Sequence, residues 1–378
     1  MPVAGTLTPT ASSLIDAARG LAALVVVFGH IMNFTADAAG HPAAYEPLRF
    51  AMGTIVHQAV VAFFVLSGYL VGGAVIQKAR SGETFLAKYL IDRVLRIELV
   101  LVPALVLTAC LDTIGMRFFG SSHVYETLDL ARRHDIGTFL LNILNLQNLF
   151  TDTFGADTPL WSLSCEFWYY MAAGFAAAGL SRAPLARPAR YGLLAVALGI
   201  VFVISGPPSF FLFGFIIWGA GAAARALPGL PTPGLRAALL LYGASVIAAA
   251  VWTTVTRLPE FQVSPTADLM GAVGFVVLLS AAQRAGEEAP PPRPLTAPAF
   301  GFLSKISYSL YATHFPALTL VAAATWGHAP WLVGVIGLPL ALVIAILFER
   351  LFEARTPALR LAARSLLRLR KAPAAASV

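Results

Sequence analysis

The chain has 378 residues, of which 58% are hydrophobic and only 12% are charged. Soluble domains contain about 45–50% apolar and about 25% charged residues, so this composition argues against a soluble enzyme and favours one polytopic membrane domain. The net charge of +7 would indicate nucleic acid only if the cations clustered on one solvated face. They lie between apolar runs, so the expected partner is the lipid bilayer and not nucleic acid. Cys110 and Cys165 lie in mostly apolar stretches and predict neither a disulfide framework nor a metal site.

Ten apolar segments are long enough, at roughly 20 residues, to cross the hydrocarbon core of a bilayer. We therefore predict an all-α, polytopic membrane protein with about ten transmembrane helices in one bundle. The fifth and sixth segments are separated only by Gly206, Pro207 and Pro208 and could instead form a helical hairpin that does not fully span. The segments cover residues 14–34, 55–77, 95–112, 160–180, 190–206, 208–226, 235–256, 267–283, 303–325 and 331–351.

The segments divide the chain into a short N-terminus (1–13), a transmembrane domain (14–355) and a basic tail (356–378). Cytoplasmic loops of membrane proteins are enriched in Lys and Arg. With the N-terminus placed inside, 20 of the 26 Lys and Arg residues fall in inner connections and the tail, and only five fall in outer connections. This bias predicts that both termini are cytoplasmic. The tail is expected to lie against the anionic leaflet without a further function.

The first segment carries three ionisable residues, Asp16, Arg19 and His30. Ionisable side chains inside a membrane are costly, so each is a functional candidate. Arg19 and His30 are 11 residues apart, which places them on one helix face and about 16 Å apart along its axis. Arg19 then lies near the cytoplasmic boundary and His30 beyond the middle of the membrane. The alternative is structural: an arginine that reaches the interface and a hydrogen-bonded histidine.

The longest connection, residues 113–158, lies on the outer side. Within it, residues 138–150 are apolar but too few to span, so they are expected to lie in the interface or to re-enter the protein. A connection of this length is often functional.

The fourth segment presents Ser162, Glu166 and Tyr170 at intervals of four residues, and this spacing places three polar side chains on one face. A carboxylate at this depth must be paired, protonated or in contact with water. The stripe indicates either a functional site or a polar contact between helices. The neighbouring aromatic residues, including Trp161, are interpreted as packing or interface anchors.

The ninth segment holds Ser307, Tyr311 and His314 on one face, and Pro316 frees a backbone carbonyl one turn earlier. A structural role for His314 is as consistent with the pattern as a functional one. Near the end of the last segment, interfacial ion pairs are expected among two carboxylates and two interleaved arginines: Glu349, Arg350, Glu353 and Arg355.

Taken together, these stretches resemble the acyltransferase family 3 membrane proteins. Arg19 and His30 form the family's Arg-x10-His arrangement, which follows an acidic residue, here Asp16. The run Phe63-Phe64-Val65-Leu66-Ser67-Gly68 resembles the Phe-Phe-x-x-Ser-Gly element, and Arg93-Val94-Leu95-Arg96 resembles the Arg-x-x-Arg element. Further matches are Trp161-Ser162-Leu163 with Glu166, and Ser307-Tyr308 followed by Tyr311, His314 and Pro316. The motifs occur in family order over residues 14–355.

Two departures from the family pattern are visible. The family often has Tyr-Pro directly after Arg-x-x-Arg-Ile, where this chain has Glu98 and Leu99, so the start of the third helix is expected to differ. Some members carry a fused extracytoplasmic hydrolase-like domain, and only about 25 residues follow the last predicted segment here. That second domain is therefore not expected.

The resemblance implies that an acyl group, commonly acetyl, moves from acetyl-CoA or another acyl-CoA to a hydroxyl group of a surface polysaccharide or lipid-linked glycan. It also implies that the protein lies in the bacterial inner membrane and that the reaction uses no metal. Donor phosphates would bind Lys88, Arg93 and Arg96 of the predicted inner loop 78–96, because arginine forks suit phosphate. His30 would be the general base, since imidazole titrates near neutral pH. Arg19 would hold a phosphate or balance Asp16, and Glu166 would orient His30 or bind the acceptor. Supporting or substrate-binding roles are expected for Ser67, Trp161, Ser162, Tyr311 and His314.

An alternative from another class is a proton-coupled transporter or flippase, in which the buried Arg, His and Glu residues form the proton pathway. The absence of an internal repeat and the order of the motifs argue against it. A membrane scaffold explains none of the buried charges. The acceptor, the length of the acyl group, a covalent acyl-enzyme relay and the oligomeric state stay open at this point.

Overall fold

The computed structural model describes residues 7–40, 46–207, 209–227, 231–256, 264–288 and 298–367. Within these ranges the protein is built from helices and contains no β-strand, which confirms the predicted all-α class. The helices that contain the ten predicted segments are α1 (Pro9–Ala38), α2 (Glu46–Ser67), α3 (Gly73–Ser81), α4 (Leu86–Phe119), α8 (Trp161–Gly179), α9 (Arg187–Ile204), α10 (Phe210–Ala226), α11 (Leu235–Thr256), α12 (Pro265–Glu288), α13 (Pro298–Ala324) and α14 (Leu332–Leu351).

In the described part of the chain, seven helical stretches are long and apolar enough to cross a membrane. The apolar helix α10 falls just short, with 17 residues. Helices α8 and α13 carry the polar residues of the fourth and ninth predicted segments, and those residues lower their hydropathy. The architecture is that of a polytopic membrane protein.

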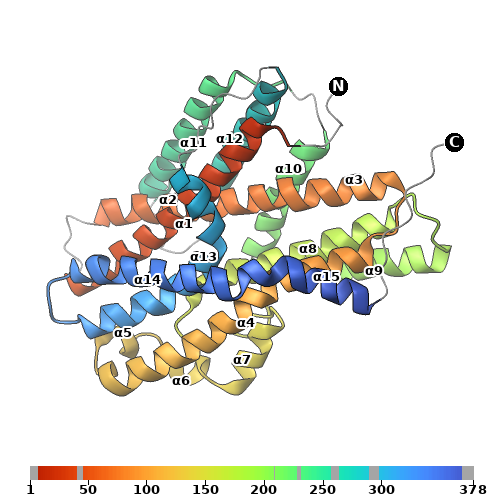
Figure 1. The fold of residues 1–378 in the computed structure, drawn as a ribbon. Coiled ribbons are helices and arrows are strands. Elements are labelled where there is room, and N and C mark those ends of the chain that lie inside the picture. The colour runs from red at the N-terminus through yellow and green to blue at the C-terminus, as the bar shows by residue number, and fades with distance from the viewer. Residues whose placement is uncertain are drawn as a thin grey trace.

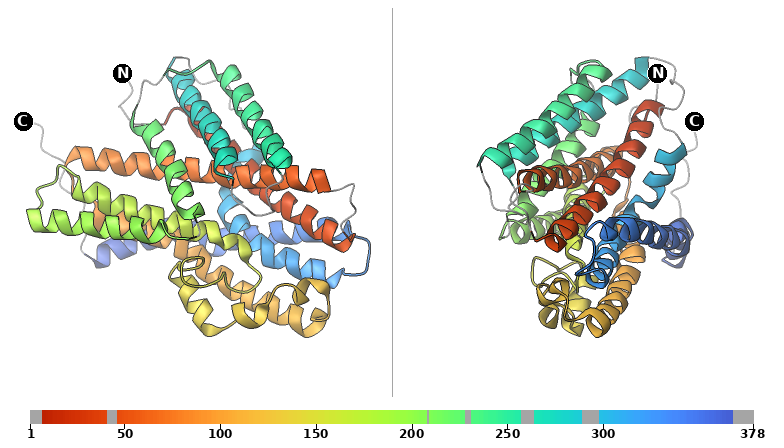
Figure 2. Two further views of the ribbon diagram at one scale, coloured as in Figure 1. Left: turned by 180° about the vertical axis from the view of Figure 1, so that it is seen from behind. Right: turned by 90° about the vertical axis from the view of Figure 1, so that its left-hand side faces the viewer.

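The long helices form one bundle (Figure 1). Helices α11 and α12 pair with each other at one edge, and α1 packs along α13, which also packs against α14 and α4. The views in Figure 2 show the short helices that follow α4 gathered at the opposite edge from α11 and α12. The fifth and sixth segments do not form the alternative hairpin, because α9 packs along α8 whereas α10 packs against the end of α2.

Helix α2 begins nine residues earlier than predicted and continues into α3 through one π-helical turn, η2 (Gly68–Gly72). Two glycines bring this turn against α10. A methyl group at Gly68 would overlap the carbonyl oxygen of Trp218, and one at Gly221 would overlap that of Val65. The two backbones therefore touch directly, and this fixes the position of Ser67 at the start of the π turn.

Helix α4 also begins earlier than predicted, directly after a turn in which Gly82 adopts a φ of 79°. Residues 86–102 contain neither glycine nor proline, so the helix begins at this turn and not at the start of the apolar run. Arg93 and Arg96 consequently lie within α4 and not in an inner loop as predicted.

The long outer connection folds against the bundle. It contains α5 (His123–Glu126), α6 (Leu130–Arg133), α7 (Ile136–Ile143) and η3 (Thr158–Leu160). From α7 to η3 the chain fully buries four polar side chains: Asn142, Asn145, Gln147 and Asp157. We call residues 136–160 the re-entrant segment.

Each of these four side chains makes at least one hydrogen bond, although Asn145 Oδ1, Gln147 Oε1 and Asp157 Oδ1 have no partner among the described residues. Asn145, at a φ of 56°, donates to Glu98 Oε1 over 2.6 Å, and its carbonyl accepts from Ser164 and Trp168. Glu98, at the position of the family's Tyr-Pro, thus anchors the outer connection. Burial, and to a lesser extent the nearby carboxylate of Asp112, raises the pKa of Asp157, which favours its neutral form.

The basic tail is helical in its described part. The last membrane helix ends at Leu351, and η4 (Glu353–Arg355) leads into α15 (Thr356–Leu366). Helix α15 packs against α4, next to the entrance of the site described below. Residues 1–6 of the predicted N-terminus and 368–378 of the predicted tail lie outside the described residues.

Candidate active site

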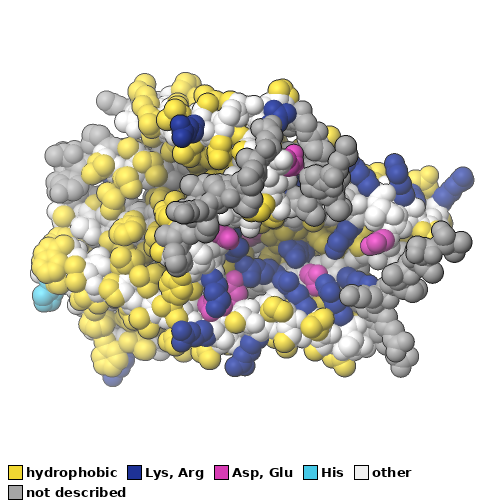
Figure 3. Space-filling model, turned by 45° about the horizontal axis from the view of Figure 1, so that its top comes forward, with side chains coloured by type: hydrophobic (Ala, Val, Ile, Leu, Met, Phe, Trp, Pro, Cys, Tyr) yellow, Lys and Arg dark blue, Asp and Glu magenta, His cyan; other side chains and the backbone are white. Residues whose placement is uncertain are grey.

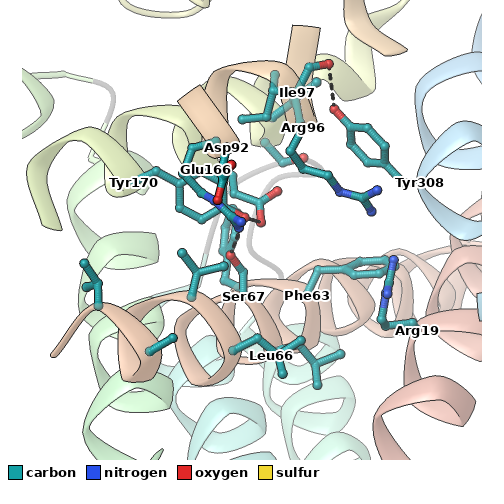
Figure 4. Close-up of a pocket in the computed structure, with 18 of the residues that line it drawn as sticks. Arg19, Phe63, Leu66, Ser67, Asp92, Arg96, Ile97, Glu166, Tyr170 and Tyr308 are labelled. Carbon is teal, nitrogen blue, oxygen red and sulfur yellow. Dashed lines mark hydrogen bonds between the residues drawn. The ribbon is translucent and has the colours of Figure 1, made fainter. Parts of the chain in front are cut away.

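A cavity of about 520 Å³ lies inside the bundle. Its walls come from α1, the α2–η2–α3 rod, α4, α8, α13 and α15, so segments from both ends of the chain meet there. Figure 4 shows side chains reaching toward this space from four helices: Arg19 from α1, Arg96 from α4, Glu166 and Tyr170 from α8, and Tyr308 from α13. Lys78, on α3, is exposed and marks the open end.

The cavity has an excess of positive charge. Among the described residues that line it, the carboxylates are Asp92 and Glu166, and the cations are Arg19, Lys78, Arg93, Arg96 and Arg360. Figure 3 shows Lys and Arg side chains gathered around a hollow on this face of the molecule, with few carboxylates among them. Like charges this close repel in a low-dielectric environment, so the arrangement favours an anionic ligand.

The two arginines of the Arg-x-x-Arg element differ in their partners. Arg96 forms an ion pair of 2.7 Å with Glu353, which also accepts a hydrogen bond from Ser309, and it lies over the ring of Tyr308. Arg93 lies between the rings of Tyr89 and Tyr170, at 6.0 and 5.6 Å from their centroids. Within the described residues Arg93 has no carboxylate partner, and its Nε lacks a hydrogen-bond acceptor. Arg93 is therefore the more available cation for a ligand.

The polar stripe of α8 faces the cavity as predicted, because Ser162, Glu166 and Tyr170 all line it. The Tyr170 hydroxyl donates to Glu166 and lies 3.0 Å from Ser67 Oγ, which accepts a bond from the indole of Trp218. This network joins α8, α2 and α10. It holds the Glu166 carboxylate at the cavity wall.

Arg19 and Asp16 tie α1 to α13. Arg19 donates to Ser307 Oγ over 3.3 Å, and Ser304 donates to Asp16 over 2.8 Å. Arg19 lines the cavity, whereas Asp16 lies outside its lining. The predicted common face of Arg19 and His30 is present, because both residues turn toward α13.

The cavity ends at Ser162 and Tyr311, whose hydroxyl oxygens lie 2.5 Å apart. Behind Tyr311 lies His314, with ring centroids 6.0 Å apart, and the next ring is His30, 5.4 Å from His314. His30 also contacts the edge of Phe315. Neither histidine lines the cavity, so His30 is separated from it by two ring contacts.

The tautomer of neutral His314 follows from its hydrogen bonds. Its Nδ1 lies 3.0 Å from the carbonyl of Leu310 and 2.9 Å from that of Tyr311, and carbonyl oxygens can only accept. Nδ1 therefore carries the hydrogen, which leaves Nε2 as an acceptor. Among the described residues, this fully buried Nε2 has no partner. The ring of His30 lies next to it, with centroids 5.4 Å apart, but makes no hydrogen bond to Nε2.

Two other predicted placements differ from the structure, and the packing role expected of Trp161 agrees with it. Glu166 bonds to Tyr170, and the contacts of His30 are with His314 and Phe315, so Glu166 does not orient His30 directly. Lys88 lies outside the cavity lining. Trp161 packs against Phe64 and Phe210 and stacks on His57, so its contacts are those of a packing residue.

The structure adds residues that the sequence did not single out. Lys78 and Arg360 line the cavity, and Arg360 belongs to the tail that was expected to have no further function. The two carboxylates expected to pair with the neighbouring Arg350 and Arg355 pair with distant residues instead: Glu349 with Lys305 over 3.0 Å and Glu353 with Arg96. Local alternation of charge could not reveal these partners. Groups of His, Cys, Asp and Glu that could hold a metal are absent from the described residues.

One comparison with known proteins gives a match. A family model described as an acyltransferase domain matches residues 13–350. No curated protein and no solved structure gives a significant match. The family match spans nearly the whole chain and includes all the motifs that meet at the cavity and at the histidine pair. Arg360 also lines the cavity but lies beyond the matched residues. The protein therefore belongs to acyltransferase family 3 and is a membrane acyltransferase.

Proposed function

We propose that the protein moves an acyl group, in the first instance acetyl, from cytoplasmic acyl-CoA to a hydroxyl group of a cell-surface polysaccharide or glycolipid. The observation that carries the proposal is the excess of cations in one intramembrane cavity, with Arg93 and Arg360 left without carboxylate partners within the described residues. Coenzyme A is a cytoplasmic polyanion, and guanidinium groups bind phosphate in a bidentate manner.

The cavity has a direction that suits a long donor. Lys78 and Arg360 lie toward the open end and would hold the nucleotide, while Ser162 and Tyr311 lie at the closed end, next to the histidine pair. The pantetheine arm would extend along the cavity and present the thioester there. Phe63, which lines the cavity edge-on to Tyr311, would have to turn aside to admit the acyl group to His30.

In the proposed reaction His30 removes the proton from the acceptor hydroxyl, whose oxygen attacks the thioester carbonyl. A C–O bond forms and the C–S bond breaks, and the proton passes from His30 to the departing thiolate, so that an ester and free coenzyme A result. Neutral His314 would accept a hydrogen bond from one nitrogen of His30 and leave the other free to act as the base.

The proposed setting is a bacterial inner membrane with both termini in the cytoplasm. It is supported by the bias of basic residues toward one side. The donor would enter at the end of the bundle that holds Lys78, and the acceptor would arrive from the other side, where the re-entrant segment lies. The bundle would then act as a conduit for the acyl group.

The experiment is thiol release from acetyl-CoA by the purified full-length protein in detergent, with surface glycans as acceptors. We expect free coenzyme A to appear together with acetyl ester on the glycan. A transporter would release no thiol, and that result would exclude the proposal.

Sidedness is tested separately in sealed right-side-out vesicles. Acceptor added outside should be modified only when acetyl-CoA has been loaded inside. Equal activity with both substrates outside and no donor in the lumen would contradict the conduit but not the transfer reaction.

A further inference from the structure

Helix α15 has the reverse of the polarity expected for a helix at a water-exposed surface. Its large apolar side chains point outward: Leu359, Leu361 and Leu366 are 41%, 68% and 82% exposed. Its arginines point inward, since Arg360 lines the cavity and Arg364 pairs with Asp92 of α4. A helix with outward leucines is suited to the lipid surface, and its inward arginines face the interior of the protein.

Two ion pairs hold this helix in place. Arg364 binds Asp92, and one turn before α15 Glu353 binds Arg96 over 2.7 Å. Between them, Thr356 donates to the carbonyl of Glu353 and secures the turn from η4 into α15. The position of Arg360 is therefore set by contacts to α4 on both sides of it.

The charge of Arg360 has no counter-ion of its own. Asp92 is the carboxylate that interacts with it electrostatically, and that carboxylate is bonded to Arg364. The other charges acting on Arg360 are the cations Arg93, Arg96 and Arg364. Its half-buried guanidinium lines the cavity, and its Nε has no acceptor among the described residues. A partly buried, unpaired cation beside other cations is unfavourable unless an anion binds.

We infer that Arg360 binds the 3′-phosphate of the acyl-CoA donor, so that α15 forms the membrane-surface wall of the donor site. The inference rests on the proposed function. The thioester must lie deepest in the cavity, and this leaves the adenosine end, which carries the 3′-phosphate, beside α15. The family model ends at residue 350, so this part of the site lies outside the segment that defines the family.

A lipid headgroup is a second source of phosphate at the same depth. The observations favour the donor, because Arg360 faces the cavity while leucines occupy the outward face of the helix. The two sources make different predictions. A lipid phosphate would matter only in a bilayer, whereas a donor phosphate matters equally in a phosphate-free maltoside detergent.

The test compares acetyl-CoA with acetyl-dephospho-CoA, which lacks only the 3′-phosphate, as donors for the full-length protein in maltoside. Arg360→Ala should raise KM for acetyl-CoA about tenfold or more, as expected for loss of a charge-assisted bond, and leave kcat unchanged. It should have little effect on KM for acetyl-dephospho-CoA. Arg360→Lys should recover part of the affinity. Arg355→Ala removes an exposed arginine outside the cavity lining and is the matched control.

Thermal stabilisation of each variant by coenzyme A gives a readout that does not depend on turnover and reveals a misfolded variant. An unchanged KM in Arg360→Ala, an equal loss for both donors, or a loss seen only in lipid nanodiscs would each overturn the inference while thiol release by the wild type stands. If the wild type neither binds coenzyme A nor releases thiol, the proposed function itself is wrong and the inference falls with it.

Discussion

Two regions of this protein bury polar groups in opposite ways. In the re-entrant segment the buried side chains are mostly neutral, and each is bonded to the chain: Asn142 donates to the carbonyls of Thr138 and Asp152, and Gln147 to that of Leu160. In the cavity cations outnumber carboxylates, and Arg93 and Arg360 have no carboxylate partner within the described residues.

This difference distinguishes polar residues that stabilise the fold from polar residues that can bind a substrate. A neutral polar group that is bonded to the chain stabilises the fold, and its removal should lower the melting temperature without changing kinetics. A cation without a counter-ion in the resting protein can instead bind an anionic substrate. Substitutions in the cavity should therefore change kinetic constants, and substitutions in the re-entrant segment should change stability.

The largest effect is expected at His30. His30→Ala should lower turnover about 10²- to 10⁴-fold through loss of the general base, with the same amount of protein in the membrane and the same melting temperature. His328→Ala removes an exposed histidine and is the control. Turnover near that of the wild type would show that His30 has a structural role and is not the general base.

The two arginines of α4 sharpen the comparison, because only one of them is paired. Arg93→Ala should raise KM for acyl-CoA about 10- to 100-fold, the loss of a charge-assisted contact, with an unchanged melting temperature and an unchanged KM for the acceptor. Arg96→Ala should also lower the melting temperature, because it leaves the Glu353 carboxylate buried with only Ser309 as its partner. Kinetics and thermal unfolding measured on the same preparations separate the two cases. An effect confined to acceptor KM would contradict the placement of the donor.

His314 is expected to act through His30 as a positioning residue. His314→Leu removes the acceptor beside His30 and should lower kcat about tenfold, the value of one hydrogen bond, and shift the acid limb of the pH–rate profile. His314→Gln keeps an acceptor and should restore much of the rate and the original profile. A purely structural role would lower stability in both variants and leave the pH profile unchanged.

The smallest effect on activity is expected in the re-entrant segment. Asn145→Gly tolerates the φ of 56° but loses the bond to Glu98, so it should lower the free energy of unfolding by about 1–3 kcal/mol. Asn145→Ala should be less stable still, because alanine resists this backbone conformation. Thermal unfolding measures both, and KM for donor and acceptor should match the wild type. A selective kinetic defect would show that this segment contributes to the acceptor site.

The positions of the membrane helices could be predicted from the sequence because each is a continuous apolar run, and all ten predicted segments correspond to helices. The polar stripe of α8 could be predicted for the same reason, since helical spacing fixes which side chains share a face. Helix ends were less accurate. The turn at Gly82 placed Arg93 and Arg96 inside α4, and the π turn after Ser67 left no sign in the hydropathy.

Partners between distant segments could not be predicted. Glu353 pairs with Arg96, 257 positions away, and not with its neighbour Arg355. Arg360 lies in the cavity only because α15 folds back onto α4. His30 and His314 were both candidates, but their contact depends on how α1 packs against α13. Such juxtapositions arise from tertiary packing, which a single sequence does not encode in any local pattern.

The glycine contacts between α2 and α10 limit the movement of one wall of the cavity. Backbone lies directly on backbone at Gly68 and Gly221, with no flexible side chain between them to change rotamer, so sliding at this seam would disrupt close packing. Any opening during the catalytic cycle must then come from the other side, where α4, α13 and α15 are joined through long side chains and ion pairs. A disulfide introduced between α2 and α10 should leave turnover intact, whereas one between α4 and α15 should slow the exchange of donor for product.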